Sequence, residues 1–176
     1  MHLQKAEVKD SEASADSFEC PSRPAGMAAP SEVDDAMRER QWQNPEEWTM
    51  TMQEWLDVIE HIMAQPQYAA TKRQKRNVTM YDINELFVKP WTKGTGCGLA
   101  VMMSKHRRQK PKKMFSHAWG EDVKECYDAL LRSVMPILIR LEPNAVLPRY
   151  FKRNKISLDE PIWFCVSEAW ICILFA

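Results

Sequence analysis

The residues with the greatest chemical capacity stand together in the run Phe-Ser-His-Ala-Trp-Gly-Glu-Asp, from Phe115 to Asp122. An imidazole can act as a general base near neutral pH, and an indole can stack on a nucleotide base. The sequence shows no partner for His117, so a hydrogen-bonded turn residue is the favoured interpretation. For Trp119, packing beneath the loop is favoured over stacking. The candidate ligand-binding residues are Ser116, His117, Trp119, Gly120, Glu121 and Asp122.

A second chemically distinctive stretch is the basic run Lys105–Lys113, in which six of nine residues are Lys or Arg. Such a run can contact nucleic-acid phosphates or act as a nuclear import signal. Nucleic-acid surfaces also interleave aromatic side chains for base stacking, and this run has none. A solvated loop is therefore the favoured interpretation, with nucleic-acid binding as an alternative. The basic side chains are Lys105, Arg107, Arg108, Lys110, Lys112 and Lys113.

Metal and cofactor chemistry finds little support in the sequence. The five Cys include no Cys-x-x-Cys pair, which argues against a zinc site and against a disulfide scaffold. Gly94, Gly96 and Gly98 match neither a Walker loop nor the dinucleotide-binding fingerprint. Cys97 could be a nucleophile only if a His approached it. We therefore expect no metal, no cofactor and no assigned catalytic residue.

The elements that must position the Phe115–Asp122 run form a predicted parallel strand–helix–strand unit. A short strand leads into the turn at His117, and two carboxylates then favour the start of a helix that Pro136 ends. One of two apolar segments supplies the second strand, and the sequence does not decide between them. This order predicts a right-handed parallel βαβ unit. The expected strands are Lys113–Ser116 and either Pro161–Val166 or Ala169–Phe175.

Upstream of this unit the sequence divides into a tail and a helical lead-in. Residues 1–40 are rich in Ser, Ala, Pro, Glu and Asp, a composition typical of a disordered acidic tail. Residues 41–111 are expected to be helical with basic loops. Their main helix spans Pro45–Gln65, and a capping box at Thr51 and Glu54 offers a start one turn later. The remaining expected features are a helix stop at Pro66, a basic loop at residues 71–77, and a short helix at Thr79–Phe87 that Pro90 ends.

Charge is distributed unevenly along a chain that has 24 basic and 24 acidic side chains. Residues 1–66 carry a net charge of −9, residues 67–113 carry +10 and residues 114–176 carry −1. Adjacent blocks of opposite sign favour an acidic segment that lies against a basic one. The composition, 45% hydrophobic and 27% charged, is typical of globular proteins and excludes a fibrous fold. No apolar run approaches the roughly 18 residues of a membrane helix.

The Phe115–Asp122 run, followed by an amphipathic helix, resembles the first conserved box of TIR domains, in which a strand ending in Ser precedes Gly-Glu-Asp. A wider set of segments is similar to TIR-like proteins of unicellular algae. The resemblance implies a flavodoxin-like α/β sheet of strand order 2-1-3-4-5, with the candidate residues at a ligand crevice beyond the strand ends. Residues 112–176 would then be the N-terminal part of a TIR-like domain. The similar segments are Phe87–Thr92, Cys97–Met103, Ser116–Trp119 and Trp170–Ile173.

The resemblance also carries expectations about function. TIR domains act as homotypic signalling adaptors, and some cleave NAD with a Glu on a later helix. The sequence ends at Ala176, before any counterpart of that Glu, so we expect a truncated product that acts as a non-catalytic interaction or signalling fragment. The alternatives are NAD or nucleotide cleavage, with the missing part supplied from elsewhere, and nucleic-acid binding through the basic run. We expect a protein partner, homotypic or not, no membrane association, and a cytoplasmic or nuclear location.

Overall fold

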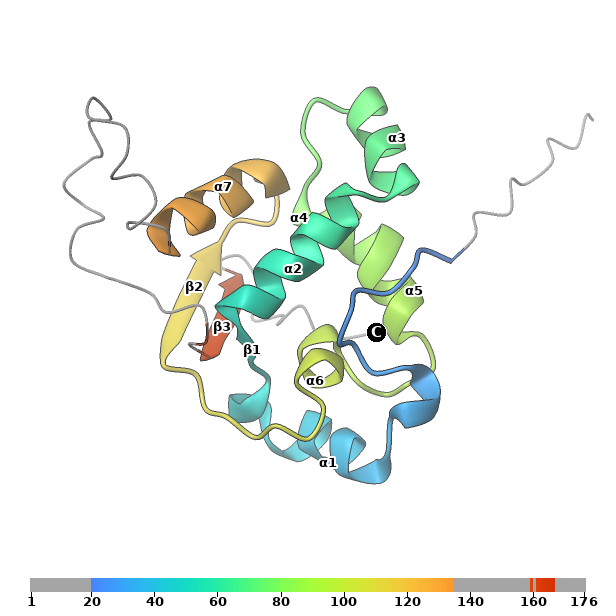
Figure 1. Cartoon of the computed structure of the whole chain (residues 1–176), viewed down its shortest axis with the longest axis vertical. Helices are drawn as coiled ribbons and strands as arrows, with labels where there is room; N and C mark the ends of the chain where they lie inside the picture. Colours follow the sequence, from blue (N-terminus) through green and yellow to red (C-terminus); the bar gives the residue numbers. More distant parts are fainter. Residues whose placement is uncertain (1–19, 135–158, 160, 167–176) are drawn as a thin grey trace, which may run out of the picture.

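The computed structural model describes residues 20–134, 159 and 161–166, and most of these residues are helical. Helix α2 crosses the middle of the molecule, with α1 and α6 below it and α3 above it in the view of Figure 1. A π-helical turn, Asn84–Val88, joins α4 to α5. The helices are α1 (Asp35–Gln43), α2 (Met52–Met63), α3 (Pro66–Gln74), α4 (Met80–Ile83), α5 (Lys89–Thr92), α6 (Leu99–Ser104) and α7 (Val123–Val134).

A small mixed sheet lies beside α2 and α7 (Figure 1). Its strands β1 (Met50–Thr51), β2 (Lys113–His117) and β3 (Pro161–Val166) stand in the order β1-β3-β2. β2 and β3 pair in parallel, with Lys113 opposite Ile162, whereas β1 is antiparallel to β3. Of the two candidates for the second strand, Pro161–Val166 therefore pairs with the first. The other candidate, Ala169–Phe175, lies outside the described residues.

The fold class differs from the doubly wound parallel sheet that the sequence predicts. A flavodoxin-like order places the first strand at the centre, but among the described strands β3 is central and β2 lies at the edge. The second neighbour of β3 is β1, which is two residues long. So short a strand has no alternating apolar pattern through which the sequence could reveal it. The described chain is thus a mostly helical structure with a small mixed sheet.

Helix α2 begins at Met52, the later of the two starts that the sequence offers. The Thr51 side-chain hydroxyl accepts a hydrogen bond from the Glu54 amide at 3.1 Å, and a Glu54 carboxylate oxygen accepts one from the Thr51 amide at 2.8 Å. Each side chain therefore satisfies a backbone group that the helix leaves unpaired. Residues 45–47 form a separate 3-10 turn instead of the first helical turn.

Pro66 ends the α2 pattern but also begins a new helix, α3. A Pro has no amide hydrogen and a fixed φ, which suit the first position of a helix. Residues 71–74, predicted to belong to a basic loop, form the last turn of α3 instead. Lys72 and Arg73 are favourable there because cations are stabilised at the negative end of the helix dipole.

The helix predicted at Thr79–Phe87 is present, but it continues further than expected. Thr79 and Asp82 form its capping box, and helical structure then runs through the π-helical turn and α5 to Thr92. Pro90, the predicted stop, lies inside this segment. Inside an α-helix, a Pro ring clashes with the backbone carbonyl group four residues earlier. For Pro90, that carbonyl group lies in the π-helical turn, where the hydrogen bonds span five residues instead of four.

Residues 20–40 pack against the rest of the molecule, in contrast to the disordered tail predicted from their composition. The Ala28 amide donates to the Met102 carbonyl at 2.9 Å, which ties this segment to α6. Composition indicates only what a segment can bury within itself, whereas these isolated apolar side chains enter a core built by other helices. Residues 1–19 lie outside the described part. The buried apolar residues of the segment are Met27, Ala28, Val33 and Met37.

The core is centred on α2 and on the helical segment that contains α5. Phe87 and Trp91 are fully buried, with ring centroids 5.7 Å apart. The Trp91 indole N–H donates to the Pro21 carbonyl at 2.9 Å, so the N-terminal segment also satisfies a buried polar group. Helix α7 packs on α2, where the Tyr127 hydroxyl donates to the Glu60 carboxylate. Each fully buried large apolar side chain contributes roughly 1.5–3 kcal/mol.

We expect the Thr51→Ala substitution to lower the free energy of unfolding by about 1 kcal/mol, because it removes the α2 cap. Thr71→Ala is the matched control, since the Thr71 hydroxyl bonds the Gln67 carbonyl within α3 and caps nothing. Its effect should stay within about 0.5 kcal/mol. Urea denaturation followed by circular dichroism measures both. Equal losses in the two variants would contradict the assigned role of Thr51.

Candidate functional site

The candidate ligand-binding residues lie at the β2–α7 corner, which comprises residues 116–122. Ser116 and His117 end β2, and their backbone is in register with Cys165 and Val166 of β3. The Glu121 amide donates to the Ala118 carbonyl at 3.1 Å and closes the turn. The predicted passage from a short strand through a turn into a helix is therefore present in the structure.

Asp122 has a structural role at this corner. Its side chain is 5% exposed, and one carboxylate oxygen accepts from the backbone amides of Lys124 at 2.9 Å and Glu125 at 3.2 Å, at the start of α7. The other oxygen accepts from the Lys72 ammonium at 2.9 Å. Burial alone would raise the pKa of Asp122, but the Lys72 hydrogen bond and the two amides together lower it. This carboxylate is ionised, and the Lys72 ammonium and the two α7 amides engage both of its oxygens.

The corner is fastened to the chain segment that begins α4. The Met80 amide donates to the Trp119 carbonyl at 3.1 Å, and the Val123 amide donates to the Val78 carbonyl at 2.8 Å. Between these bonds, Thr79 and Asp122 form an isolated antiparallel bridge. The segment at 78–80 therefore lies directly beside the turn after β2 and the start of α7.

An aromatic pair, Tyr81 and Trp119, completes the surface of the corner. The two rings meet edge to face, with centroids 5.0 Å apart and an angle of 61° between their planes. Trp119 is half-buried, whereas Tyr81 is 54% exposed. The Trp119 indole nitrogen is buried without a hydrogen-bond partner among the described residues. Gly120 and Glu121 are exposed beside the pair.

Sequence reasoning did not assign Tyr81 or Lys72 to this site. Both come from segments about forty to fifty residues before the corner, and only the tertiary fold brings them to it. The capping box at Thr79 is visible in the sequence and predicts a helix start there. No sequence signal links that helix start to the β2–α7 corner.

Three of the six basic side chains in the run lie against acidic residues that precede them in the sequence. The Arg107 guanidinium donates to both carboxylate oxygens of Glu54, at 2.7 and 2.5 Å. Arg108 donates through Nε to Glu47 at 2.8 Å, and the Lys105 ammonium lies 3.8 Å from a carboxylate oxygen of Glu32. This arrangement agrees with the prediction that the acidic block lies against the basic one. The three carboxylates reduce the attraction of these side chains for a nucleic-acid backbone.

Two thiols in the described part of the chain, Cys97 and Cys126, are poorly suited to nucleophilic chemistry. Burial raises the pKa of Cys126 to about 11, with a further contribution from the charge of Glu121. Burial also raises the pKa of Cys97. Because the thiolate is the reactive form, both residues are held in their unreactive state at neutral pH. In the described ranges, no group of three His, Cys, Asp or Glu side chains is placed to hold a metal ion.

Comparisons with known proteins give no information on this site. No protein-family model, no curated protein and no solved structure matches the chain. The TIR-like resemblance thus stays a prediction from the sequence. Among the helices of the described residues, none has the length and apolar character of a membrane span.

The assigned role of Asp122 predicts a stability difference that depends on pH. Because folding lowers the pKa of Asp122 from its ordinary value of 3.8, its ionised form stabilises the protein above about pH 4. That contribution is lost as the pH falls through the folded-state pKa. Asp122→Asn keeps a capping side chain but removes the charge, so we expect a loss of about 1–3 kcal/mol at pH 7 that shrinks markedly at pH 3.

Asp128→Asn serves as the control for this measurement, since Asp128 forms an exposed pair with Lys124 four residues earlier on α7. Its substitution should change the free energy of unfolding by less than about 0.5 kcal/mol at either pH. Urea unfolding at the two pH values gives all four differences. If the Asp122→Asn substitution lowered the free energy of unfolding equally at pH 3 and at pH 7, the charge-based explanation would be contradicted.

Proposed function

We propose that this chain is a non-catalytic protein-interaction module that associates with a second copy of itself through the Tyr81–Trp119 pair. The single observation that carries the proposal is the exposed Tyr81 ring, which stands on Trp119 at the β2–α7 corner. Tyr and Trp are enriched among the residues that contribute most to the affinity of protein interfaces. The TIR-like resemblance, which implies homotypic signalling, supports the same function independently.

The corner is preorganised, and this favours binding. Backbone hydrogen bonds hold the segments that carry Met80 and Trp119 together, so the aromatic pair rests on a rigid base. A side chain that is already ordered loses less conformational entropy when a partner binds. The exposed Tyr81 side chain also combines an apolar ring with a hydroxyl group. Such a side chain suits a surface that is exposed to solvent in the free protein and buried in the complex.

The charges around the pair favour a protein partner over a polyanion. Lys72 is paired with Asp122, and Lys75 is paired with Asp82, so both signs are present and balanced beside the aromatic rings. A surface of balanced sign gives no net attraction to nucleic acid. In a two-fold symmetric dimer, the same patch meets itself, and a patch with both signs can complement its own copy.

The chemistry of the corner supports a non-catalytic role. A general acid needs a carboxyl group whose pKa lies near the working pH, whereas the pKa of Asp122 is lowered and its oxygens are engaged with Lys72 and the α7 amides. Cys126, on the following helix, is held as a thiol. Asp122 and Cys126 therefore act to build the corner, whose exposed surface includes the Tyr81 ring.

Self-association provides the direct test. We expect Tyr81→Ala to weaken dimerisation at least tenfold, since removal of a central aromatic side chain costs about 2 kcal/mol or more. Trp42→Ala is the matched control, because Trp42 is 71% exposed but lies on α1, away from the corner. Sedimentation equilibrium over a range of concentrations measures the dissociation constants. A wild-type chain that remains monomeric throughout, or equal losses in the two variants, would contradict the proposal.

The enzymatic alternative has its own test. Incubation of the purified chain with NAD, followed by chromatographic analysis of products, should show no turnover above a blank. NAD cleavage that disappears in a His117→Ala variant would overturn the non-catalytic role. This measurement is independent of self-association, so the two parts of the proposal can fail separately.

A further inference from the structure

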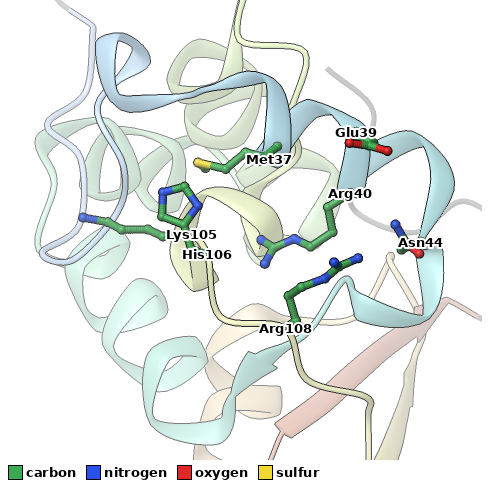
Figure 2. Close-up of a pocket in the computed structure, with 8 residues that line it drawn as sticks. Met37, Glu39, Arg40, Asn44, Lys105, His106 and Arg108 are labelled. Atoms are coloured by element: carbon green, nitrogen blue, oxygen red, sulfur yellow. The ribbon is translucent and has the colours of Figure 1, made fainter.

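A second candidate site lies far from the corner, in a pocket between α1 and the loop that follows α6 (Figure 2). Its volume is about 140 Å³. Pockets for drug-sized ligands and cofactors have volumes of about 300–1,000 Å³, so this pocket is too small for a nucleotide but has room for a small ion and water. Its polar lining residues are Glu39, Arg40, Asn44, Lys105, His106 and Arg108.

Arg40 is the central feature of the pocket. It is only 3% exposed, and its guanidinium donates to the Arg107 carbonyl at 2.7 Å, the Val101 carbonyl at 3.1 Å and the Ser104 hydroxyl at 2.8 Å. All three acceptors are neutral. The Nε atom is buried and has no hydrogen-bond partner among the described residues. The hydrogen bonds orient this buried cation, but they do not neutralise its charge.

Further positive charge surrounds Arg40. Arg108 extends from the loop toward Arg40 and Asn44 (Figure 2). Burial first of all lowers the pKa of Arg40; the charge of Glu47 opposes this, and those of Arg108 and Arg107 add to it. The Arg108 guanidinium, although one of its nitrogens is bound to Glu47, adds a second positive group beside buried Arg40 for an anion to contact.

The nearby carboxylates satisfy this charge only in part. Glu39 is the one acidic residue among the described residues that line the pocket. Glu47 accepts from the Nε atom of Arg108, while Lys105 and His106 lie 3.8 and 3.7 Å from their acidic neighbours, which is longer than a direct hydrogen bond. The Lys105 ammonium and the Arg108 guanidinium therefore have donor capacity left for a ligand.

We propose that this pocket binds a single phosphate group, as the free ion or as a small phosphomonoester. A phosphate carries close to two negative charges at neutral pH and accepts several hydrogen bonds, which matches a buried guanidinium with two further cations, Lys105 and Arg108, at its rim. Arg108 supplies a planar donor group, and the Asn44 amide supplies a neutral one. The site does not depend on the aromatic corner, so it stands or falls independently of the proposed self-association.

Isothermal titration of the full chain with inorganic phosphate, at pH 7 and at constant ionic strength maintained with chloride, tests the proposal. We expect saturable binding at one site per chain. Arg108→Gln should weaken it about tenfold or more, because a charged hydrogen-bond donor is lost. Lys110→Gln is the matched control, since it makes the same change of charge in the same loop outside the pocket, and it should change affinity less than twofold.

Substitution of the buried Arg40 risks unfolding the protein. A second measurement therefore tests phosphate binding without it. Phosphate should raise the melting temperature of the wild-type chain above that in an equal ionic strength of chloride, and this shift should be lost in Arg108→Gln. Phosphoserine distinguishes the source: binding of both compounds supports a phosphomonoester site, and binding of inorganic phosphate alone supports a free-ion site. Absence of saturable binding, or equal weakening by the Arg108→Gln and Lys110→Gln substitutions, would overturn the proposal.

Discussion

The contact between Glu54 and Arg107 is the interaction on which much of the structure depends. One carboxylate caps the start of α2 by accepting from the Thr51 amide, and the same carboxylate accepts two hydrogen bonds from the Arg107 guanidinium. It thereby joins the central helix, strand β1 and the loop that leads into β2. A charge-assisted pair of this kind is stronger than a neutral hydrogen bond, and its partial burial limits screening by salt.

This junction explains how a basic run becomes part of the fold instead of a free electrostatic patch. With Arg107 held by Glu54 and Arg108 by Glu47, the loop after α6 is fixed against the acidic N-terminal segment. The loop then enters the sheet, where the Lys112 amide donates to the Pro161 carbonyl at 3.0 Å. The loop at residues 105–112 therefore leads into the start of β2, and the aromatic corner follows the end of the same strand.

The small sheet shows why an α/β prediction reached only part of the fold. Two apolar segments with an amphipathic helix between them were identified in the sequence, because each has its own local pattern. Their pairing in parallel fits that pattern. The position of β3 in the centre of the described sheet, however, is created by Met50 and Thr51, which pair with β3 directly before the α2 cap.

The sequence by itself determined the local signals: the capping boxes at Thr51 and Thr79, the amphipathic helix after Asp122, and the approach of acidic residues to basic ones. These depend on neighbouring residues or on net charge, which the order of residues contains directly. Only the tertiary structure decided that Tyr81 meets Trp119, that Lys72 neutralises Asp122, and that Arg40 is buried without a carboxylate partner among the described residues. Such contacts join residues tens of positions apart, and their formation depends on how helices pack around a shared core. The same reason accounts for residues 20–40, whose few apolar side chains are buried by a core that they do not build.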